Sequence, residues 1–124
     1  MHPVFSQGFV GSSSAPPRAT ILVPKVIATD CILLREWCSR DIATVRATSL
    51  LHSGSVILTS HYMDGTLSSP VSEELRLLIA HCNAEKSPLI IGSDTNSHST
   101  AWGARDCNPR GLELEAFCAS NGLT

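Results

Sequence analysis

The feature that most constrains the fold is an alternation of strand-like and helix-like segments in the second half of the chain. The segment VILTSHYM (56–63) has the length and apolar content of a strand. The next, VSEELRLLIAHCN (71–83), places apolar residues at spacings of three and four, as one face of a helix does. A further apolar run, SPLIIGSD (87–94), is typical of a fully buried strand. Strands joined through helices predict an α/β layered sheet.

The first half of the chain contains further strand-like segments. RATILVPK (18–25) fits a short strand, and IATVRATSLL (42–51) alternates in the way expected of a strand with one wetter face. Residues 30–41 fit either a strand or a short helix. A turn at 52–55 then leads into 56–63, which we expect to be a central strand.

Two pairs of a capping residue and a proline predict where helices begin. Ser69 precedes Pro70, and Asn108 precedes Pro109; in each pair the first side chain can cap a helix whose first residue is the proline. The second of these helices is predicted to stop at Gly122, because glycine readily takes the left-handed conformation that ends a helix.

Length and composition indicate one domain or a piece of one, with much surface to bury. The chain has 124 residues, of which 43% are hydrophobic and only 16% charged. Residues 1–17 are rich in Gly, Ser and Pro and are expected to form a flexible arm, so that the ordered part begins near Arg18. The net charge of −2 argues against a protein that binds nucleic acid through overall positive charge.

Several classes of protein are excluded by what the sequence lacks. The five cysteines are widely spaced with no Cys-x-x-Cys pair, which favours scattered buried thiols in a reducing compartment over disulfides or zinc. No run approaches the ~18 apolar residues of a membrane span. We also expect no signal peptide, because the N-terminus has neither a basic leader nor a sustained apolar stretch.

The polar residues that follow the 87–94 strand are the first candidates for chemistry. Asp94 and Asn96 lie two residues apart, so in an extended chain both project to the same side. Tyr62 stands at the end of the 56–63 strand, and α/β sheets bind ligands beyond the carboxyl ends of their strands. The carboxylate could orient a water or help to hold a cation, and the amide could donate to a phosphate oxygen. Alternatively, both side chains merely satisfy backbone groups in a turn.

From Asp94 onward the sequence resembles a known family. IIGSDTNSHSTAWGARDCNPRGLELEAFCASNGL (90–123) is similar to the endonuclease/exonuclease/phosphatase fold, in the branch encoded by non-LTR (LINE-type) retrotransposons. That branch carries Asp-x-Asn-x-His, Trp-Gly and Asn-x-Arg-Gly ahead of a Leu-rich helix. The matching positions are Asp94, Asn96, His98, Trp102, Gly103, Asn108, Arg110 and Gly111. Upstream, PRATILV and TSHY resemble two further strands of the family, so the likeness spans about residues 17–124.

The resemblance implies a metal-dependent phosphodiesterase that nicks target DNA during retrotransposition. Carried over by position, Asp94 activates the attacking water and binds Mg²⁺, Asn96 steadies the scissile phosphate, and Tyr62 supports the same centre. The candidates for contact with DNA are Arg110, His98 and Trp102. Trp102 can instead pack the loop, His98 can serve as a hydrogen-bonding residue of that loop, and Arg110 can pair with Asp106 or touch a phosphate.

The sequence also departs from the family pattern. The family has an Asn and a metal-binding Glu ahead of the RATILV strand, whereas residues 1–17 contain no Asn, Asp or Glu. It also has strands with a second Asp and an Asp-His pair after the helix at which this chain stops, at Thr124. We therefore expect residues 18–124 to be the central part of an incomplete layered α/β sandwich, truncated at both ends. Such a chain is expected to bind Mg²⁺ weakly, to have little or no nicking activity, and to self-associate through unpaired strands.

Other interpretations of the same resemblance remain open. The chain can be a non-catalytic interaction module or a decayed relic of such a domain, in which case Asp94 and Asn96 have no measurable role. It can also belong to another branch of the superfamily that cleaves different phosphodiesters. For the retrotransposon interpretation, the expected partner is DNA, with no membrane association, and the expected location is intracellular, in the nucleus.

Overall fold

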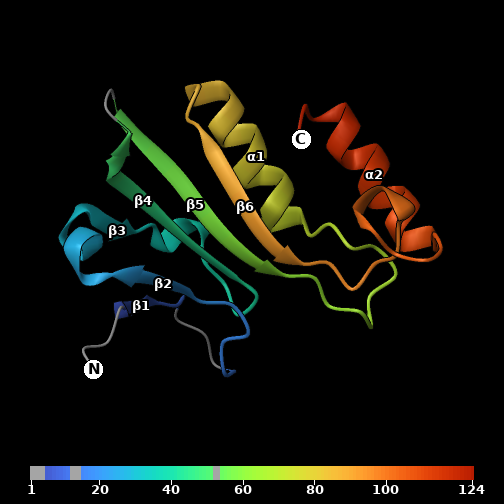
Figure 1. Cartoon of the computed structure of the whole chain (residues 1–124), viewed down its shortest axis with the longest axis horizontal. Helices are drawn as coiled ribbons and strands as arrows, with labels where there is room; N and C mark the ends of the chain where they lie inside the picture. The colour runs from blue at the N-terminus through green and yellow to red at the C-terminus, as the bar shows by residue number, and fades with distance from the viewer. Residues whose placement is uncertain (1–4, 12–14, 52–53) are drawn as a thin grey trace.

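The computed structural model describes residues 5–11, 15–51 and 54–124 of the chain (Figure 1). Its strands are β1 (Phe5–Phe9), β2 (Ile21–Pro24), β3 (Cys31–Leu33), β4 (Ile42–Leu51), β5 (Gly54–Tyr62) and β6 (Leu89–Asp94). Its α-helices are α1 (Glu73–Glu85) and α2 (Pro109–Ser120). Short 3-10 helices are η1 (Lys25–Asp30), η2 (Arg35–Trp37) and η3 (Thr100–Trp102). Neither α1 nor α2, the α-helices of the described ranges, is long and apolar enough to cross a membrane.

A four-stranded sheet in the order β3-β4-β5-β6 forms the centre of the molecule. The pairs β3/β4 and β4/β5 are antiparallel, whereas β5 and β6 are parallel and are joined through α1. The predicted α/β class is therefore confirmed, and β5 is an interior strand of this sheet, as expected. Because β5 and β6 run in the same direction, their carboxyl ends lie side by side, with Tyr62 paired to Asp94 in the register.

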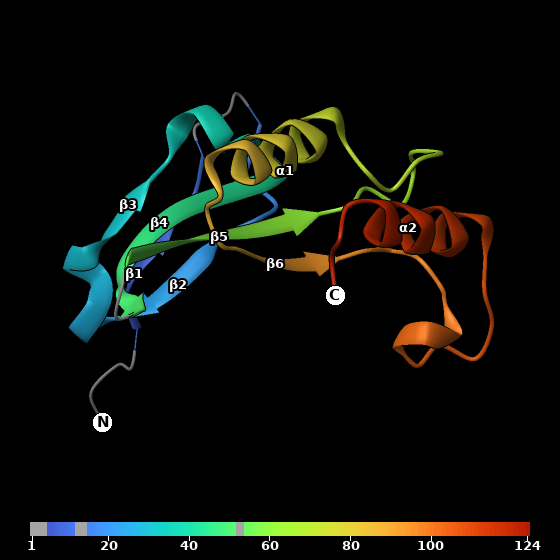
Figure 2. The ribbon, with the colours of Figure 1, turned by 90° about the horizontal axis from the view of Figure 1, so that it is seen from above.

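Each face of the sheet packs on its own hydrophobic cluster. On one face, β5 contributes Ile57 to a cluster with Leu75, Leu78 and Phe117 of the two helices. On the other face, Val56 of β5 packs with residues that include Val23 of β2. The helices and the β1–β2 pair thus lie on opposite sides of the sheet (Figure 2). Burial at about 25 cal/mol per Å² of apolar surface makes these two clusters the main source of stability.

The start of α1 differs from the sequence-based prediction. Ser69 was expected to cap the helix, but the cap is Ser72, whose hydroxyl accepts a hydrogen bond from the amide of Leu75 at 3.2 Å. The hydroxyl of Ser69 instead donates to the carboxylate of Glu113 on α2, at 2.8 Å. The physical reason is burial: Val71 is only 5% exposed, because the segment before the helix runs into the core.

Strand β6 was predicted to be fully buried, and this prediction is wrong. Ile90 is 60% exposed, and the residues from Gly92 to Asp94 are exposed as well. Among the described strands β6 pairs only with β5, so it lies at the edge of the sheet. An apolar run alone does not distinguish an interior strand from an edge strand that packs on one side.

Part of the segment at 1–17, predicted to be a flexible arm, is a strand in the structure. Phe5–Phe9 forms strand β1, which pairs with β2 in an antiparallel register that includes Phe9 with Ile21. Within the predicted arm, residues 1–4 and 12–14 lie outside the described residues, as do residues 52 and 53 of the predicted turn. The backbone groups of β2 explain the difference, because β1 satisfies them along that edge.

The second helix begins and ends where the sequence predicts. Asn108 caps α2 by accepting a hydrogen bond from the amide of Gly111, and Pro109 is the first helical residue. Gly122 follows the helix with a φ angle of +68°, the left-handed conformation that favours glycine.

Candidate active site

Tyr62 and Asp94 lie next to each other at the carboxyl ends of β5 and β6. Side chains alternate along a strand, so Tyr62 shares a face with Val56 and Leu58, which pack on the β1–β2 side. Asp94 lies on the same face, because directly paired residues of neighbouring strands point to the same side of a sheet. The expectation that the two residues share one edge of the fold therefore agrees with the structure.

The carboxylate of Asp94 is exposed to solvent and makes one local contact. Its Oδ1 accepts a hydrogen bond from the amide of Asn96 at 3.3 Å, and its carbonyl oxygen accepts from the amide of Met63 at 2.9 Å. The first contact is a turn of the kind that an Asp commonly forms with the residue two positions on. The carboxylate remains accessible for a ligand through its exposed side.

Asn96 connects the loop after β6 to the loop after β5. Its Nδ2 donates to the carbonyl oxygen of Met63 at 2.8 Å. Its backbone has a φ angle of +45°, the left-handed region that residues other than glycine rarely adopt. An Asn amide carries two N–H donors and one acceptor oxygen, so one N–H and the oxygen remain for a further partner.

An arginine that the sequence analysis did not single out for chemistry lies against Tyr62. The guanidinium carbon of Arg18 lies 4.6 Å from the centre of the Tyr62 ring, which places a cation over the aromatic face. Arg18 also forms a two-pronged ion pair with Asp41, at 2.6 and 2.8 Å, and a third contact with Asp64 at 3.2 Å. These contacts raise the pKa of Arg18, chiefly through the hydrogen bonds that Arg18 donates to Asp41.

The two acids that hold Arg18 flank β4 and β5. Asp41 precedes β4, and Asp64 follows β5. The pKa of Asp64 is lowered to about 2, first by hydrogen bonds from the hydroxyl and the amide of Thr66 and further by Arg18. Both carboxylates are paired with the guanidinium of Arg18.

The loop between β6 and α2 carries the residues predicted to contact DNA. Nδ1 of His98 lies 3.1 Å from the carboxylate of Asp106, and both side chains are mostly exposed. The indole nitrogen of Trp102 donates to the carbonyl oxygen of Ser97, while 43% of that residue is exposed. Trp102 thus both ties the loop together and presents part of its ring at the surface.

Arg110 does not pair with Asp106, one of the two partners considered from the sequence. Asp106 pairs with His98, and the guanidinium of Arg110 donates to the carbonyl oxygens of Asn96, Leu67 and Thr95. A side chain that binds main-chain carbonyls leaves no pattern in the sequence, so this arrangement could not be found there. Whether Arg110, His98 or Trp102 touches DNA stays a prediction.

A buried histidine lies close to this edge of the sheet. Nε2 of His61 lies 2.9 Å from the hydroxyl of Ser72, the residue that caps α1. Within the described residues its Nδ1 is buried without a hydrogen-bond partner. Burial lowers the pKa of His61, an effect that Asp41 and Glu74 oppose. The ring of His81 packs on that of Trp37, with 5.1 Å between the ring centres.

Comparisons with known proteins identify the family. The model of the endonuclease-reverse transcriptase family matches residues 56–124, more than half of the chain. This chain belongs to that family. The segment matched contains most of β5 and all of α1, β6 and α2, and with them Tyr62, Asp94 and Asn96. The resemblance drawn from the sequence is therefore confirmed. No curated protein gives a significant match to the chain.

A solved structure supports the fold of this family member. The chain is similar to the endonuclease domain of TRAS1, a telomere-specific non-LTR retrotransposon, with a TM-score of 0.72 and 23% sequence identity. The match covers 94% of this chain and 52% of the TRAS1 domain, so the chain spans about half the length of that domain. At this identity the likeness concerns the fold.

The residues described here do not by themselves fit a bound divalent cation. No group of three or more His, Cys, Asp or Glu side chains in the described ranges is placed to hold a metal ion. Mg²⁺ requires near-octahedral oxygen coordination, and Asp94 supplies one exposed carboxylate. Asp41 and Asp64, which flank β4 and β5, are both bound to Arg18.

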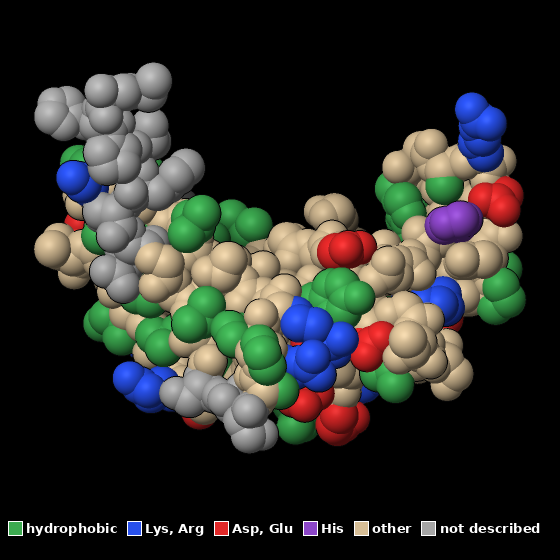
Figure 3. All heavy atoms as spheres, turned by 90° about the horizontal axis from the view of Figure 1, so that it is seen from below, with side chains coloured by type: hydrophobic (Ala, Val, Ile, Leu, Met, Phe, Trp, Pro, Cys, Tyr) green, Lys and Arg blue, Asp and Glu red, His purple; other side chains and the backbone are tan. Residues whose placement is uncertain are grey.

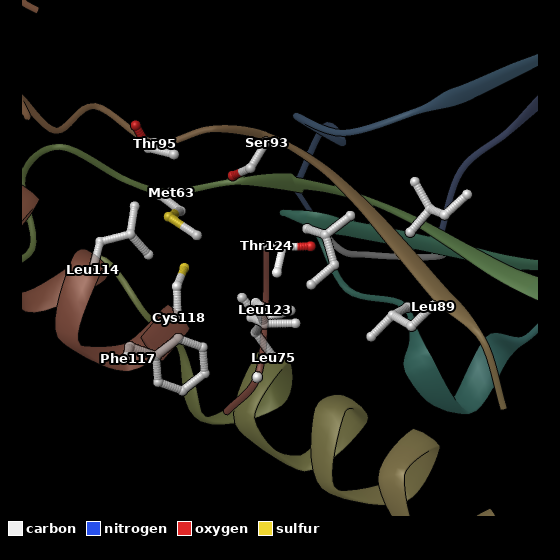
Figure 4. A pocket seen from close by; sticks show the side chains of 13 residues that line it. Met63, Leu75, Leu89, Ser93, Thr95, Leu114, Phe117, Cys118, Leu123 and Thr124 are labelled. Atoms are coloured by element: carbon white, nitrogen blue, oxygen red, sulfur yellow. The ribbon is translucent and has the colours of Figure 1, made fainter. Parts of the chain in front are cut away.

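One cavity adjoins Tyr62, and another lies between β6 and the helices. One, of about 360 Å³, is lined by Tyr62, His61 and Asp64 together with the loop before α1. The other, of about 460 Å³, lies between β6 and the two helices and is lined largely by apolar side chains such as Leu114 and Phe117 (Figure 4). Neither Asp94 nor Asn96 lines the second cavity, which therefore lies apart from the candidate site.

The surface seen from below is not a uniformly basic face (Figure 3). Lys and Arg side chains gather near its middle, with Asp and Glu side chains directly beside them. All five cysteines are free thiols, and Cys107 is exposed, although buried thiols were expected. A hydrogen bond from the amide of Thr100 lowers the pKa of the Cys107 thiol.

Proposed function

We propose that this chain supplies the strand-end part of a DNA endonuclease site of the type found in non-LTR retrotransposons. The observation that carries the proposal is the pairing of Tyr62 with Asp94 at the carboxyl ends of two parallel strands, with Asn96 two residues on. Open α/β sheets bind their ligands at such ends. The family and the likeness to the TRAS1 endonuclease domain support DNA as the substrate.

Each of the three residues has a distinct role in this proposal. The exposed carboxylate of Asp94 accepts the proton of a water that attacks the phosphorus atom of the scissile phosphodiester. The N–H of Asn96 that does not bind Met63 donates to a phosphate oxygen, where negative charge increases as the water attacks. The hydroxyl of Tyr62, held beneath Arg18, donates a hydrogen bond at the same centre.

The 124 residues alone are proposed to cleave DNA slowly or not at all. The resemblance implies Mg²⁺, which would stabilise negative charge at the phosphate when bound. Asp94 is its candidate ligand, and in the described part of the chain no cluster of further ligands surrounds Asp94. Within residues 1–124, no residues are matched to the upstream Glu or to the Asp-His pair that the resemblance implies. Mg²⁺ binding by Asp94 is therefore expected to be weak, and rate loss of orders of magnitude follows from missing catalytic groups.

A second candidate function is a non-catalytic member of the same fold. The observation that favours it is that Asp94 and Asn96 already satisfy backbone groups, through the Asn96 amide and the Met63 carbonyl. In that case the two side chains hold the strand ends together and have no substrate. Their replacement would then alter stability and leave DNA binding unchanged.

DNA binding and DNA cleavage can be measured separately on the same protein. We expect the chain to bind a short fluorescent duplex in anisotropy titrations and to leave supercoiled plasmid largely intact in Mg²⁺. Asn96→Ala should weaken duplex binding by roughly tenfold, the effect of one hydrogen bond to a charged group. Thr95→Ala is the matched control, because Thr95 lines the apolar cavity beside α2.

Two results would contradict parts of this proposal. Equal affinity of the wild type and Asn96→Ala for the duplex would favour the non-catalytic candidate. Ready conversion of the plasmid to open circles, abolished by Asp94→Ala, would show that the chain is an active nuclease and that the expected low activity is wrong.

A further inference from the structure

Arg110 makes contact with both loops that carry the candidate residues. It is the second residue of α2, and its Nε donates to the carbonyl oxygen of Asn96 at 3.1 Å. Its Nη2 lies 3.4 Å from the carbonyl oxygen of Thr95, and its Nη1 donates to that of Leu67 in the loop between β5 and α1. Three donors of one rigid guanidinium thus bind two segments that are far apart in the sequence.

Asn108 holds the same loop from its other end. Its Oδ1 accepts a hydrogen bond from the amide of His98 at 3.0 Å, and its own amide donates to the carbonyl oxygen of His98 at 3.0 Å. Residues 95–98 are therefore bound along their main chain by the start of α2. This support matters because Asn96 has a φ of +45°, a conformation that persists when surrounding contacts determine it.

The backbone at residues 95 and 96 determines how the candidate side chains point. The left-handed turn at Asn96 directs the side-chain amide of this residue to the carbonyl oxygen of Met63. It directs the backbone amide of the same residue to the carboxylate of Asp94. If the carbonyls of Thr95 and Asn96 lose their common donor, this turn can relax toward an ordinary extended conformation. Both side chains would then leave the edge at which Tyr62 lies.

We propose that Arg110 is a positioning residue that fixes Asp94 and Asn96 relative to the loop after β5. That Arg110 positions these residues for DNA cleavage rests on the proposed function. That Arg110 holds the loop in place does not. Arginine is suited to this role because its planar fork presents donors in several fixed directions, whereas lysine carries a compact ammonium on a flexible stem. A lysine at position 110 keeps the positive charge but cannot donate to the three carbonyl oxygens at once.

Three variants of the full 124-residue chain test this assignment: Arg110→Ala, Arg110→Lys and, as a control, Arg105→Ala. Arg105 is an exposed arginine of the same loop. The readouts are the NMR signals of the Asn96 side-chain amide and the hydrogen exchange of the His98 amide, recorded without DNA or metal. Methyl signals of buried Val45 and Ile57 report whether each variant is folded.

We expect both Arg110 variants to move the Asn96 side-chain signals and to raise His98 amide exchange by roughly tenfold or more, as loss of one charge-assisted hydrogen bond predicts. Arg105→Ala should change neither readout. The proposal is overturned if Arg110→Lys, with its methyl signals intact, leaves both readouts as they are in the wild type. If Arg110→Ala does not fold, Arg110→Lys alone decides.

A duplex titration separates this proposal from the proposed function. If Arg110→Lys displaces the Asn96 signals and the wild type does not bind duplex DNA, the positioning role holds and the nuclease function fails. If Arg110→Lys keeps the wild-type Asn96 signals and loses duplex affinity, Arg110 contacts DNA directly and the positioning role is wrong.

Discussion

Gly111 and His98 approach each other so closely that position 111 has no space for a side chain. A Cβ atom built on Gly111 would lie 1.8 Å from the carbonyl oxygen of His98, and 2.5 Å from its carbonyl carbon. Both are backbone atoms, so one of the two segments has to move. This contact explains in physical terms why a glycine follows Arg110 at the start of α2.

Gly111→Ala is therefore expected to destabilise the protein by about 1–3 kcal/mol, the usual cost of forcing extra atoms into a packed site. Urea unfolding followed by circular dichroism measures the effect. Gly92→Ala is the control, because no atom lies within 4 Å of the added Cβ at that position, and its effect should stay within about 0.5 kcal/mol. Equal stabilities of the two variants would show that α2 does not dock on the loop as described.

His61 makes stability depend on pH. Burial lowers the pKa of His61 in the folded protein. Below the ordinary histidine value near 6.5, the unfolded chain therefore binds a proton at this residue more readily than the folded protein does. Above that pH, His61 leaves the free energy of unfolding unchanged. As the pH falls from there toward the pKa of the folded state, proton binding by the unfolded chain progressively lowers the free energy of unfolding. We expect the free energy of unfolding to fall between pH 7 and pH 5.

His61→Gln should remove a large part of this pH dependence, whereas His98→Gln, a change at an exposed histidine, should leave it in place. Urea unfolding at several pH values measures the slope. A slope unchanged in His61→Gln would mean that other groups cause the loss of stability in acid.

The open edge of β6 predicts self-association. Between Lys86 and Asp94 this segment has no charged side chain, and Ile90 is 60% exposed. Edge strands that lack charge readily pair with another strand, and lysine on the edge opposes such pairing. Ile90→Lys should shift the protein toward monomer in sedimentation velocity.

Val26→Lys is the control for the added charge, because Val26 is 81% exposed in η1, away from β6. A wild type that is monomeric at high concentration would contradict this prediction. So would an equal effect of the two lysine variants, which would indicate a response to net charge alone.

The sequence was sufficient to place the candidate residues because strand ends coincide in a parallel pair. The apolar runs end at Tyr62 and Asp94, and the helix between them makes the two strands parallel neighbours, so the residues meet at one edge. The capped start of α2 was equally predictable, because Asn108 and Pro109 act within a few residues of each other.

The features that were missed depend on contacts between distant parts of the chain. Arg18 meets Asp41 and Asp64 across 23 and 46 residues of sequence, and no local pattern indicates that pairing. Ser69 and Ser72 are equally good caps by residue type, and the buried Val71 between them decides which one is used. The exposure of β6 depends on which strand lies next to it rather than on its own residues.

The most direct test of the account is to map duplex DNA on the protein by NMR. A short duplex is expected to shift the side-chain amide signals of Asn96 and the backbone signals of Tyr62 and Asp94, and Asp94→Asn is expected to change this response. Shifts confined to the helices α1 and α2, on the other side of the sheet, would contradict the claim that the ends of β5 and β6 face a DNA phosphate.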